Sequence, residues 1–218
     1  MYRLTSGLQR AQMRPDPNAT RHAMMVAGER LMAEEGLDNP PLHSIAKAAG
    51  LGNKYAVQYH FTDRSGLIHA ILAMRSEAIA LRRGDLLVEA GTRGLIGDVG
   101  ALAEAMYLPL VEQVGEDGSR TFARFLLLTM TQPWSADTME VLEDAQEDAN
   151  TVRIIELFAK ALPELEPRTL KWRLRIQTRT LLNCLIEHEN MMRVGRRSYS
   201  EPEMIEDALR MIGAAISA

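Results

Sequence analysis

Residues 45–61 read IAKAAGLGNKYAVQYHF and predict two short helices separated by a glycine turn. We expect the first over residues 41–49, because Asn39-Pro40-Pro41 breaks the chain before it, with Asn39 as its cap, and Gly50 ends it. We expect the second over residues 54–61, with Asn53 as its cap. Two helices joined by so short a turn predict a helix-turn-helix unit, whose second helix enters the major groove of DNA.

A helical wheel divides the predicted second helix into two faces. Val57 and Phe61 point inward, whereas the outward face and its edges comprise Lys54, Tyr55, Gln58, Tyr59 and His60. Tyrosine and glutamine offer hydrogen-bonding and apolar atoms to the edges of bases, and glutamine can pair with adenine through two hydrogen bonds. Arg64, just beyond this helix, is placed to meet a phosphate. The alternative is that both tyrosines pack beneath the C-terminal part of the chain and that Gln58 is an ordinary surface residue.

The rest of the chain also has helical spacing, and runs with the two-residue period of strands are hard to find. A first helix is expected over residues 20–35, and a fourth after Asp63 as its cap. Further helices are expected over residues 98–114, 119–131, 136–161, 167–193 and 201–217. The sequence therefore predicts an all-α fold, with an N-terminal three-helix helix-turn-helix domain and a larger C-terminal helical domain.

Breaker residues and glycines suggest where these domains begin and end. A breaker cluster closes a flexible N-terminal arm over residues 1–18. Glycines between residues 84 and 100 mark a second boundary. We therefore expect the helix-turn-helix domain and its connecting helix over residues 19–83, and a helical body over residues 84–218.

Charge is unevenly distributed between the N-terminal part of the chain, residues 1–83, which we call the head, and the body. Residues 1–83 carry 11 Lys and Arg against 7 Asp and Glu, a net charge of +4, whereas residues 84–218 carry 14 against 22, a net charge of −8. A basic head on an acidic body favours an anionic partner for the head alone. Chance segregation of charge is the alternative interpretation.

Composition excludes several classes of protein. The 218 residues are 46% hydrophobic and 25% charged, which is typical of a folded globular chain. The single cysteine, Cys184, requires no oxidising compartment and lies in an apolar stretch, where we expect an unreactive core thiol. The sequence has neither a signal peptide nor a membrane-spanning run, so we expect a cytoplasmic protein.

Motifs for catalysis or for a bound metal or cofactor are missing. The sequence has no HExxH, no GxSxG and no glycine-rich phosphate loop, so we expect no enzymatic activity, no cofactor and no metal. One acidic cluster could attract a divalent cation. Its carboxylates are those of Glu140, Glu143, Asp144, Glu147 and Asp148. Their spacing matches no EF-hand, so a solvated acidic face is the better interpretation.

Three fragments of the first 75 residues resemble a known family. They are Arg21-x-x-Met24-Met25-x-Ala27-Gly28-x-x-Leu31-Met32-x-Glu34-x-Gly36, Ile45-Ala46-x-x-Ala49-Gly50-Leu51 and Tyr59-His60-Phe61-x-x-Arg64-x-x-Leu67. In this order and spacing, over about residues 20–75, they are similar to the DNA-binding domain of the tetracycline-repressor (TetR) family of transcriptional regulators. The resemblance implies an all-helical homodimer that binds a palindromic DNA operator and releases it when a small-molecule effector enters the body.

The resemblance also implies which residues touch DNA. It puts Lys54, Tyr55, Gln58, Tyr59 and His60 on the recognition helix, His43 and Ser44 at backbone contacts, and Arg64 at the position of a phosphate-contacting lysine. Three residues depart from the family pattern. Tyr55 stands where glycine is usual, Gln58 where tyrosine is usual, and Pro41 where threonine is usual. These departures leave open which bases are read.

The two C-terminal helices carry apolar residues at heptad-like spacing. The positions are Leu174, Thr178, Leu181, Leu185, His188 and Met192, followed by Ile205, Leu209, Ile212 and Ile216. Two such helices from each subunit would form a four-helix dimer interface, which the resemblance also implies. An intramolecular core seam fits the same spacing equally well.

Apolar residues of the body helices are candidates for a ligand pocket. They are Met106, Tyr107, Phe122, Phe125, Leu126, Thr129, Met130 and Trp134. Methionines adapt their shape and suit a loosely selective cavity, which favours a hydrophobic effector. Plain core packing is the alternative for each of these residues.

The sequence thus favours a ligand-responsive transcriptional repressor. A helical module that binds protein through its third helix is the first alternative, and an unrecognised helical-bundle enzyme is the second. Duplex binding that weakens steeply with salt distinguishes the repressor from the protein-binding module. Turnover of a small molecule would favour the enzyme.

Overall fold

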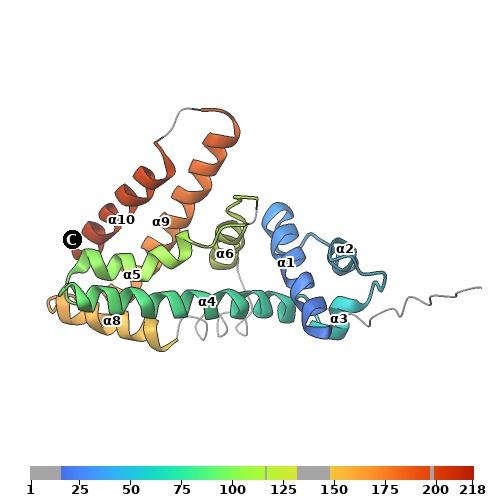
Figure 1. The fold of residues 1–218 in the computed structure, drawn as a ribbon, viewed down its shortest axis with the longest axis horizontal. Coiled ribbons are helices and arrows are strands. Elements are labelled where there is room, and N and C mark those ends of the chain that lie inside the picture. The colour runs from blue at the N-terminus through green and yellow to red at the C-terminus, as the bar shows by residue number, and fades with distance from the viewer. Residues whose placement is uncertain (1–15, 116, 132–147, 197–198) are drawn as a thin grey trace, which may run out of the picture.

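The computed structural model describes residues 16–115, 117–131, 148–196 and 199–218 (Figure 1). In these ranges the regular structure is entirely helical, which confirms the predicted all-α fold. The helices are α1 (Pro17–Glu35), α2 (Leu42–Ala48), α3 (Ala56–Phe61), α4 (Arg64–Thr92), α5 (Val99–Val111), α6 (Thr121–Thr131), α8 (Ala149–Ala161), α9 (Pro167–Arg193) and α10 (Glu201–Ser217).

Helices α9 and α10 have the bounds that the sequence predicts, whereas α1 begins earlier than predicted. The side chain of Asp16 caps α1 by accepting a hydrogen bond from the backbone N–H of Asn18 at 2.9 Å. Pro17 occupies the first helical position, where its missing N–H is not needed. Residues 17 and 18 therefore belong to α1 and not to the predicted arm. Of the helix predicted over residues 136–161, residues 136–147 lie outside the described residues.

Helix α4 runs without a break through the boundary predicted between residues 83 and 84. It is 29 residues long and joins the head, at its start, to the body around its second half (Figure 1). A Cβ on Gly84 would lie 2.9 Å from the side-chain nitrogen of Asn150 in α8. The glycine therefore marks a place where two helices pack closely, and not the end of a helix.

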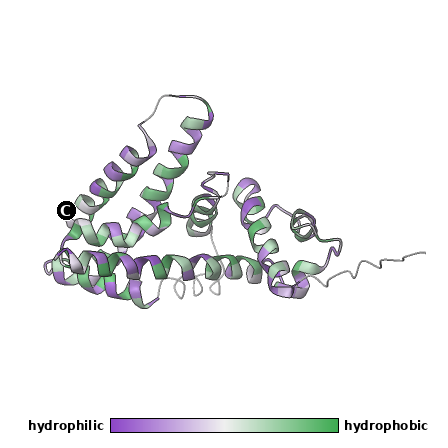
Figure 2. Ribbon diagram, viewed as in Figure 1, coloured by the Kyte–Doolittle hydropathy of each residue, from purple (hydrophilic) through white to green (hydrophobic). Residues whose placement is uncertain are grey.

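The head consists of α1, α2, α3 and the first half of α4, packed around one apolar core. Each helix contributes a fully buried side chain to it, namely Met24, Ile45, Val57 and Leu67. In the body, α5, α6, α8, α9 and α10 contribute Leu102, Phe125, Phe158, Leu181 and Ile212. Hydrophobic and hydrophilic residues alternate around the longer helices, as expected for helices with one buried face (Figure 2).

A buried ion pair of the head lies at the junction between head and body. Glu29 of α1 is only 3% exposed and accepts hydrogen bonds from Nε and Nη2 of Arg75 in α4 at 2.7 and 2.8 Å. The third guanidinium nitrogen of Arg75 donates to Gln113 at 3.3 Å, and the guanidinium lies 5.4 Å from the ring centre of Phe122 in α6. One arginine therefore links the first helix of the head to the start of α6 in the body.

Candidate nucleic-acid interface and ligand pocket

Helix α3 is anchored by its inner face and exposes its outer face. Val57 and Phe61 are buried, and the guanidinium of Arg21 in α1 lies 4.9 Å from the ring centre of Phe61. On the outer face Gln58 is exposed, Tyr59 is 84% exposed and Tyr55, just before the helix, is 59% exposed. The predicted division into inward and outward residues is therefore confirmed. The alternative in which both tyrosines pack beneath the body is wrong.

The turn before α3 is held by Asn53. Its side-chain oxygen accepts a hydrogen bond from the N–H of Tyr55 at 3.0 Å, and its backbone oxygen accepts one from the N–H of Ala56 at 3.1 Å. The helix therefore begins at Ala56, two residues later than predicted, and Lys54 and Tyr55 precede it. The ammonium of Lys54 lies 4.9 Å from the ring centre of Tyr55. His60, at the end of the helix, is half-buried and packs edge-on against Tyr59.

Helix α2 begins differently from the prediction. Its cap is Pro41, and the side chain of Asn39 donates instead to the backbone oxygen of Glu35 in α1. Asn39 therefore closes the end of α1 and does not cap α2. His43 is exposed and Ser44 is half-buried, and both lie in the first turn of α2.

Arg64 lies at the start of α4 and turns its guanidinium toward the protein. Nη1 donates to the backbone oxygen of Leu37 and Nη2 to that of Pro40, each at 2.8 Å. These carbonyls belong to the loop between α1 and α2. Arg64 thus positions that loop against α4, a role that the sequence pattern did not predict, because it depends on two carbonyls remote in the chain.

The residues predicted to line a ligand pocket lie in the core of the body. Buried members are Met106, Tyr107, Phe122, Phe125, Thr129 and Met130, while Leu126 is half-buried. Trp134 lies outside the described residues. The hydroxyl of Tyr107 donates to the backbone oxygen of Leu174 in α9 at 2.9 Å, and burial raises its pKa. None of these residues lines either of two pockets on the described part of the chain, so the core-packing alternative accounts for what is seen.

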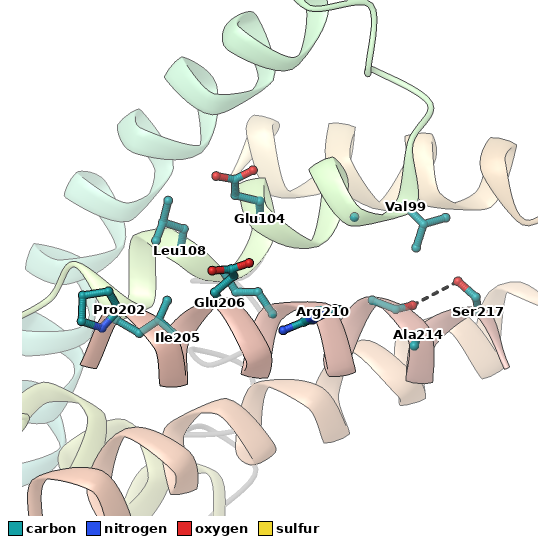
Figure 3. Close-up of a pocket in the computed structure, with 12 residues that line it drawn as sticks. Val99, Glu104, Leu108, Pro202, Ile205, Glu206, Arg210, Ala214 and Ser217 are labelled. Atoms are coloured by element: carbon teal, nitrogen blue, oxygen red, sulfur yellow. Dashed lines mark hydrogen bonds between the residues drawn. The ribbon is translucent and has the colours of Figure 1, made fainter. Parts of the chain in front are cut away.

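A groove of about 780 Å³ lies instead between α5 and α10 (Figure 3). The residues that line it are Val99, Gly100, Glu104, Leu108, Pro202, Ile205, Glu206, Leu209, Arg210, Gly213, Ala214 and Ser217. Ile205 and Leu209 were predicted from their spacing to form a dimer seam. Spacing identifies an apolar helix face but not the neighbour of that face, so the groove could not be found from the sequence.

Most of the predicted dimer seam is buried within a single chain. Six of its residues are at most 8% exposed and so offer little surface to a partner in this conformation, namely Leu174, Leu181, Leu185, His188, Ile212 and Ile216. Nε2 of His188 donates to the backbone oxygen of Tyr199 at 3.0 Å, and the hydroxyl of Thr178 donates to that of Leu174, also at 3.0 Å. The burial of these residues within one chain fits the intramolecular alternative. Met192 is 57% exposed.

The remaining candidate sites have structural explanations. Within the described residues, no group of three or more His, Cys, Asp or Glu side chains is arranged to hold a metal ion. Of the predicted acidic cluster only Asp148 is among the described residues. Its side chain caps α8 by accepting hydrogen bonds from the N–H groups of Asn150 and Thr151. Cys184 is half-buried, and burial raises the pKa of its thiol, as expected for an unreactive cysteine. None of the helices described combines the length and apolar character needed to cross a bilayer.

Comparison with known proteins places this arrangement in a family. The profile described as "Tetracyclin repressor-like, C-terminal domain" matches residues 104–215. A TetR family transcription regulator from Marinobacter aquaeolei VT8 has a similar structure, with a TM-score of 0.64 and 17% identity over 93% of this chain and 98% of that one. NalD, the secondary repressor of the MexAB-OprM multidrug efflux pump in Pseudomonas aeruginosa, has a TM-score of 0.54 and 22% identity over 93% and 98% of the two chains.

No curated protein matches the chain. The two structural relatives are too distant in sequence to carry more than the fold. The family profile, by contrast, covers more than half of the chain, and it matches the body, while the fragments that resemble the family DNA-binding domain lie in the head. The chain therefore belongs to the tetracycline-repressor (TetR) family of transcriptional regulators.

Proposed function

We propose that this regulator is a homodimeric repressor that binds a palindromic DNA operator through α3 and releases it when a small hydrophobic effector binds the body. The observation that carries the proposal is the outer face of α3. Tyr55 and Tyr59 are 59% and 84% exposed, next to an exposed Gln58, on a helix whose inner face is core. Large aromatic side chains so exposed contribute little to folding and are suited to the edges and backbone of a DNA groove.

The surrounding residues support this interface in different ways. Lys54, His43 and Ser44 flank α3 and can contact phosphates, which give affinity without sequence preference. Gln58 and the two tyrosines can reach base edges, with His60 at the flank. Arg64 acts indirectly, because its guanidinium is engaged with the loop before α2.

A dimer is part of the proposal because one α3 reads only one half-site. Two-fold symmetry can place two recognition helices about 34–36 Å apart, which is one turn of DNA. Since most of the heptad seam is internal, we infer that the subunits meet through exposed apolar side chains of α9 and α10. Trp172 is 61% exposed and Met211 is 48% exposed.

The effector response is supported by the junction between head and body. Helix α1 packs directly on α6, and Arg75 joins Glu29 to the start of α6. A ligand that favours one arrangement of the body would thereby change the spacing of the two heads. Effector and operator must then weaken each other's binding by the same factor.

The test is selection of bound sequences from random duplex DNA, followed by measurement of Gln58→Ala on the selected duplex and its single-base variants. We expect a palindromic consensus, and we expect Gln58→Ala to lose about 1–3 kcal/mol of discrimination at one symmetric pair of positions. Lys54→Ala is the matched variant and should weaken binding to all duplexes about equally. Failure to enrich any sequence, or equal effects of both substitutions on every duplex, would contradict the proposal.

A further inference from the structure

The groove between α5 and α10 has the size and lining of a small-molecule site (Figure 3). Its volume of about 780 Å³ lies within the roughly 300–1,000 Å³ that is typical of pockets for drug-sized ligands. Apolar side chains dominate the lining, with Leu108 on α5 and Ile205 and Leu209 on α10. An organic ligand of moderate size could therefore place one apolar face against this open groove.

The packing of α5 and α10 creates this groove and holds it open. At one end the helices nearly touch, because a Cβ on Gly213 would lie only 3.8 Å from the Cα of Gly100. From there α10 rises away from α5 (Figure 1). At the other end the buried Arg120 donates both to the backbone oxygen of Val111, where α5 ends, and to the carboxylate of Glu201, where α10 begins. With both ends fixed, the space between the helices is a stable feature of the body.

The charged groups of the groove are mostly acidic. Figure 3 shows Glu104 on α5 and Glu206 on α10, on the two facing helices. Neither forms an ion pair with any residue that the structure describes. The cation of Arg210 pairs with Asp207, which is not part of the lining, at 3.0 Å. The groove therefore presents two carboxylates that form no ion pair among the described residues, together with one arginine, beside an apolar surface.

Two other charged groups lie behind Glu104. Arg93 and Glu89 line a small neighbouring pocket together with Glu104, and Glu89 pairs with Arg82 at 3.3 Å. Arg93 forms no ion pair within 4 Å among the described residues and does not line the groove. Like Arg210 in the lining, Arg93 could compete with a positively charged ligand, so both arginines are included among the variants below.

We propose that this groove binds a lipophilic monocation, with its apolar body against Leu108, Ile205 and Leu209 and its charge between Glu104 and Glu206. Burying apolar surface supplies affinity, and the two carboxylates select a cation over an anion of the same shape. This assignment names the ligand class for the effector response proposed above. Its regulatory meaning therefore rests on that proposed function. Binding itself is measured without DNA.

The experiment compares two ions of nearly the same size and shape and of opposite charge, tetraphenylphosphonium and tetraphenylborate, by isothermal titration calorimetry on the full chain. We expect one tetraphenylphosphonium per chain, bound at least about tenfold more tightly than tetraphenylborate. Glu104→Gln and Glu206→Gln should each weaken phosphonium binding about two- to fivefold, as expected for partly exposed charge pairs. The double variant should combine both losses.

Matched variants control for general acidity and for shape. Glu156→Gln removes an exposed carboxylate of α8 outside the groove and should leave the affinity unchanged. Arg210→Gln and Arg93→Gln should not weaken binding, since each removes a positive charge. Leu209→Trp enlarges a half-buried side chain of the lining without changing its charge and should weaken binding at least about tenfold.

Equal affinity for the two ions, or unchanged phosphonium affinity in the double variant, would overturn the proposal. Sedimentation of Leu209→Trp tests whether a second copy of the chain covers the groove instead: loss of a wild-type dimer in this variant would also overturn the proposal. Duplex binding with and without tetraphenylphosphonium separates the two proposals. A protein that binds the cation but no duplex contradicts only the operator function, and one that binds a duplex but not the cation contradicts only this assignment.

Discussion

Arg64 holds the helix-turn-helix unit in shape through two hydrogen bonds to the loop between α1 and α2. Hydrogen bonds from a charged group contribute about 1.5–3 kcal/mol each when their partners would otherwise be left unsatisfied. We expect Arg64→Ala to lower the free energy of unfolding by about 3 kcal/mol or more, measured by urea denaturation, because both bonds are lost. It should also weaken binding to all duplexes equally, because the whole unit is loosened.

Gln58→Ala is the matched variant for Arg64→Ala. The Gln58 side chain is exposed, so its removal should change the free energy of unfolding by less than about 0.5 kcal/mol. Its effect should fall on sequence preference. If Arg64→Ala unfolds at the wild-type urea concentration, the positioning role assigned to Arg64 is wrong.

Glu203 gives the start of α10 a dependence on pH. Its carboxylate accepts hydrogen bonds from the hydroxyl of Ser200 at 2.6 Å and from its N–H at 2.9 Å, and these bonds lower the pKa of Glu203. A lowered pKa means that the ionised group stabilises the folded state above the ordinary glutamate pKa, and that this contribution disappears as the pH falls through the lowered value.

Glu203→Gln should therefore lower the melting temperature at pH 7 and converge with the wild type in acid, where Glu203 is protonated. Thermal melting followed by circular dichroism across this pH range checks the expectation. A difference that stays constant down to the lowest pH would show that the carboxylate charge contributes nothing to the cap.

The turn between α3 and α4 depends on a glycine. A Cβ on Gly66 would lie 2.0 Å from the backbone oxygen of Phe61, and a backbone atom cannot move aside as a side chain can. We expect Gly66→Ala to lower the free energy of unfolding by at least about 2 kcal/mol, since overpacking of this kind typically costs about 1–3 kcal/mol. Gly52→Ala is the control, because a Cβ there meets nothing within 4 Å. Equal denaturation midpoints for the two variants would contradict the packing argument.

Individual helices could be predicted well because their ends carry local signals. Helix α10 begins after Ser200, which forms a capping box with Glu203, and α9 begins with Pro167 at its first position. The length of α4 could not be predicted, because Gly84 is a breaker locally and a packing residue in three dimensions. Asn39 was misassigned for a similar reason, since its side chain reaches back to Glu35 in α1.

The functional surfaces were predictable to different degrees. The outer face of α3 follows from the wheel alone, because Val57 and Phe61 fix its inner side. The neighbours of the apolar faces in the body could not be predicted in this way. An apolar stripe such as the one containing Leu181 and Ile212 has the same spacing whether it meets its own chain or a partner, and only tertiary packing decides between them. The α5–α10 groove depends on how far apart two remote helices lie.

At the scale of the whole molecule, Arg75 connects head and body, because it pairs with Glu29 in the head and contacts Gln113 and Phe122 in the body. Removing one partner of a buried pair leaves the other charge unsatisfied and typically costs about 3–5 kcal/mol. Arg75 keeps some solvent contact, with 24% of its side chain exposed, so we expect Glu29→Gln to lower the free energy of unfolding by about 2–3 kcal/mol. Urea denaturation measures this loss.

Glu34→Gln on the same helix provides the control for Glu29→Gln. Glu34 pairs with Arg30 on the surface, with side chains 56% and 50% exposed, and such pairs contribute roughly 0–1 kcal/mol. The two substitutions change charge identically, so a similar effect from both would mean that the buried pair does not hold the junction together.

The proposed operator binding depends on the exposed face of α3 in each of two copies of the chain. The most direct measurement is a titration of the selected duplex over a series of salt concentrations, with the stoichiometry of the complex determined by sedimentation. We expect two chains per duplex and a linear fall of the logarithm of affinity with the logarithm of salt concentration. A single chain on the palindrome, or duplex affinity that does not change with salt, would contradict it.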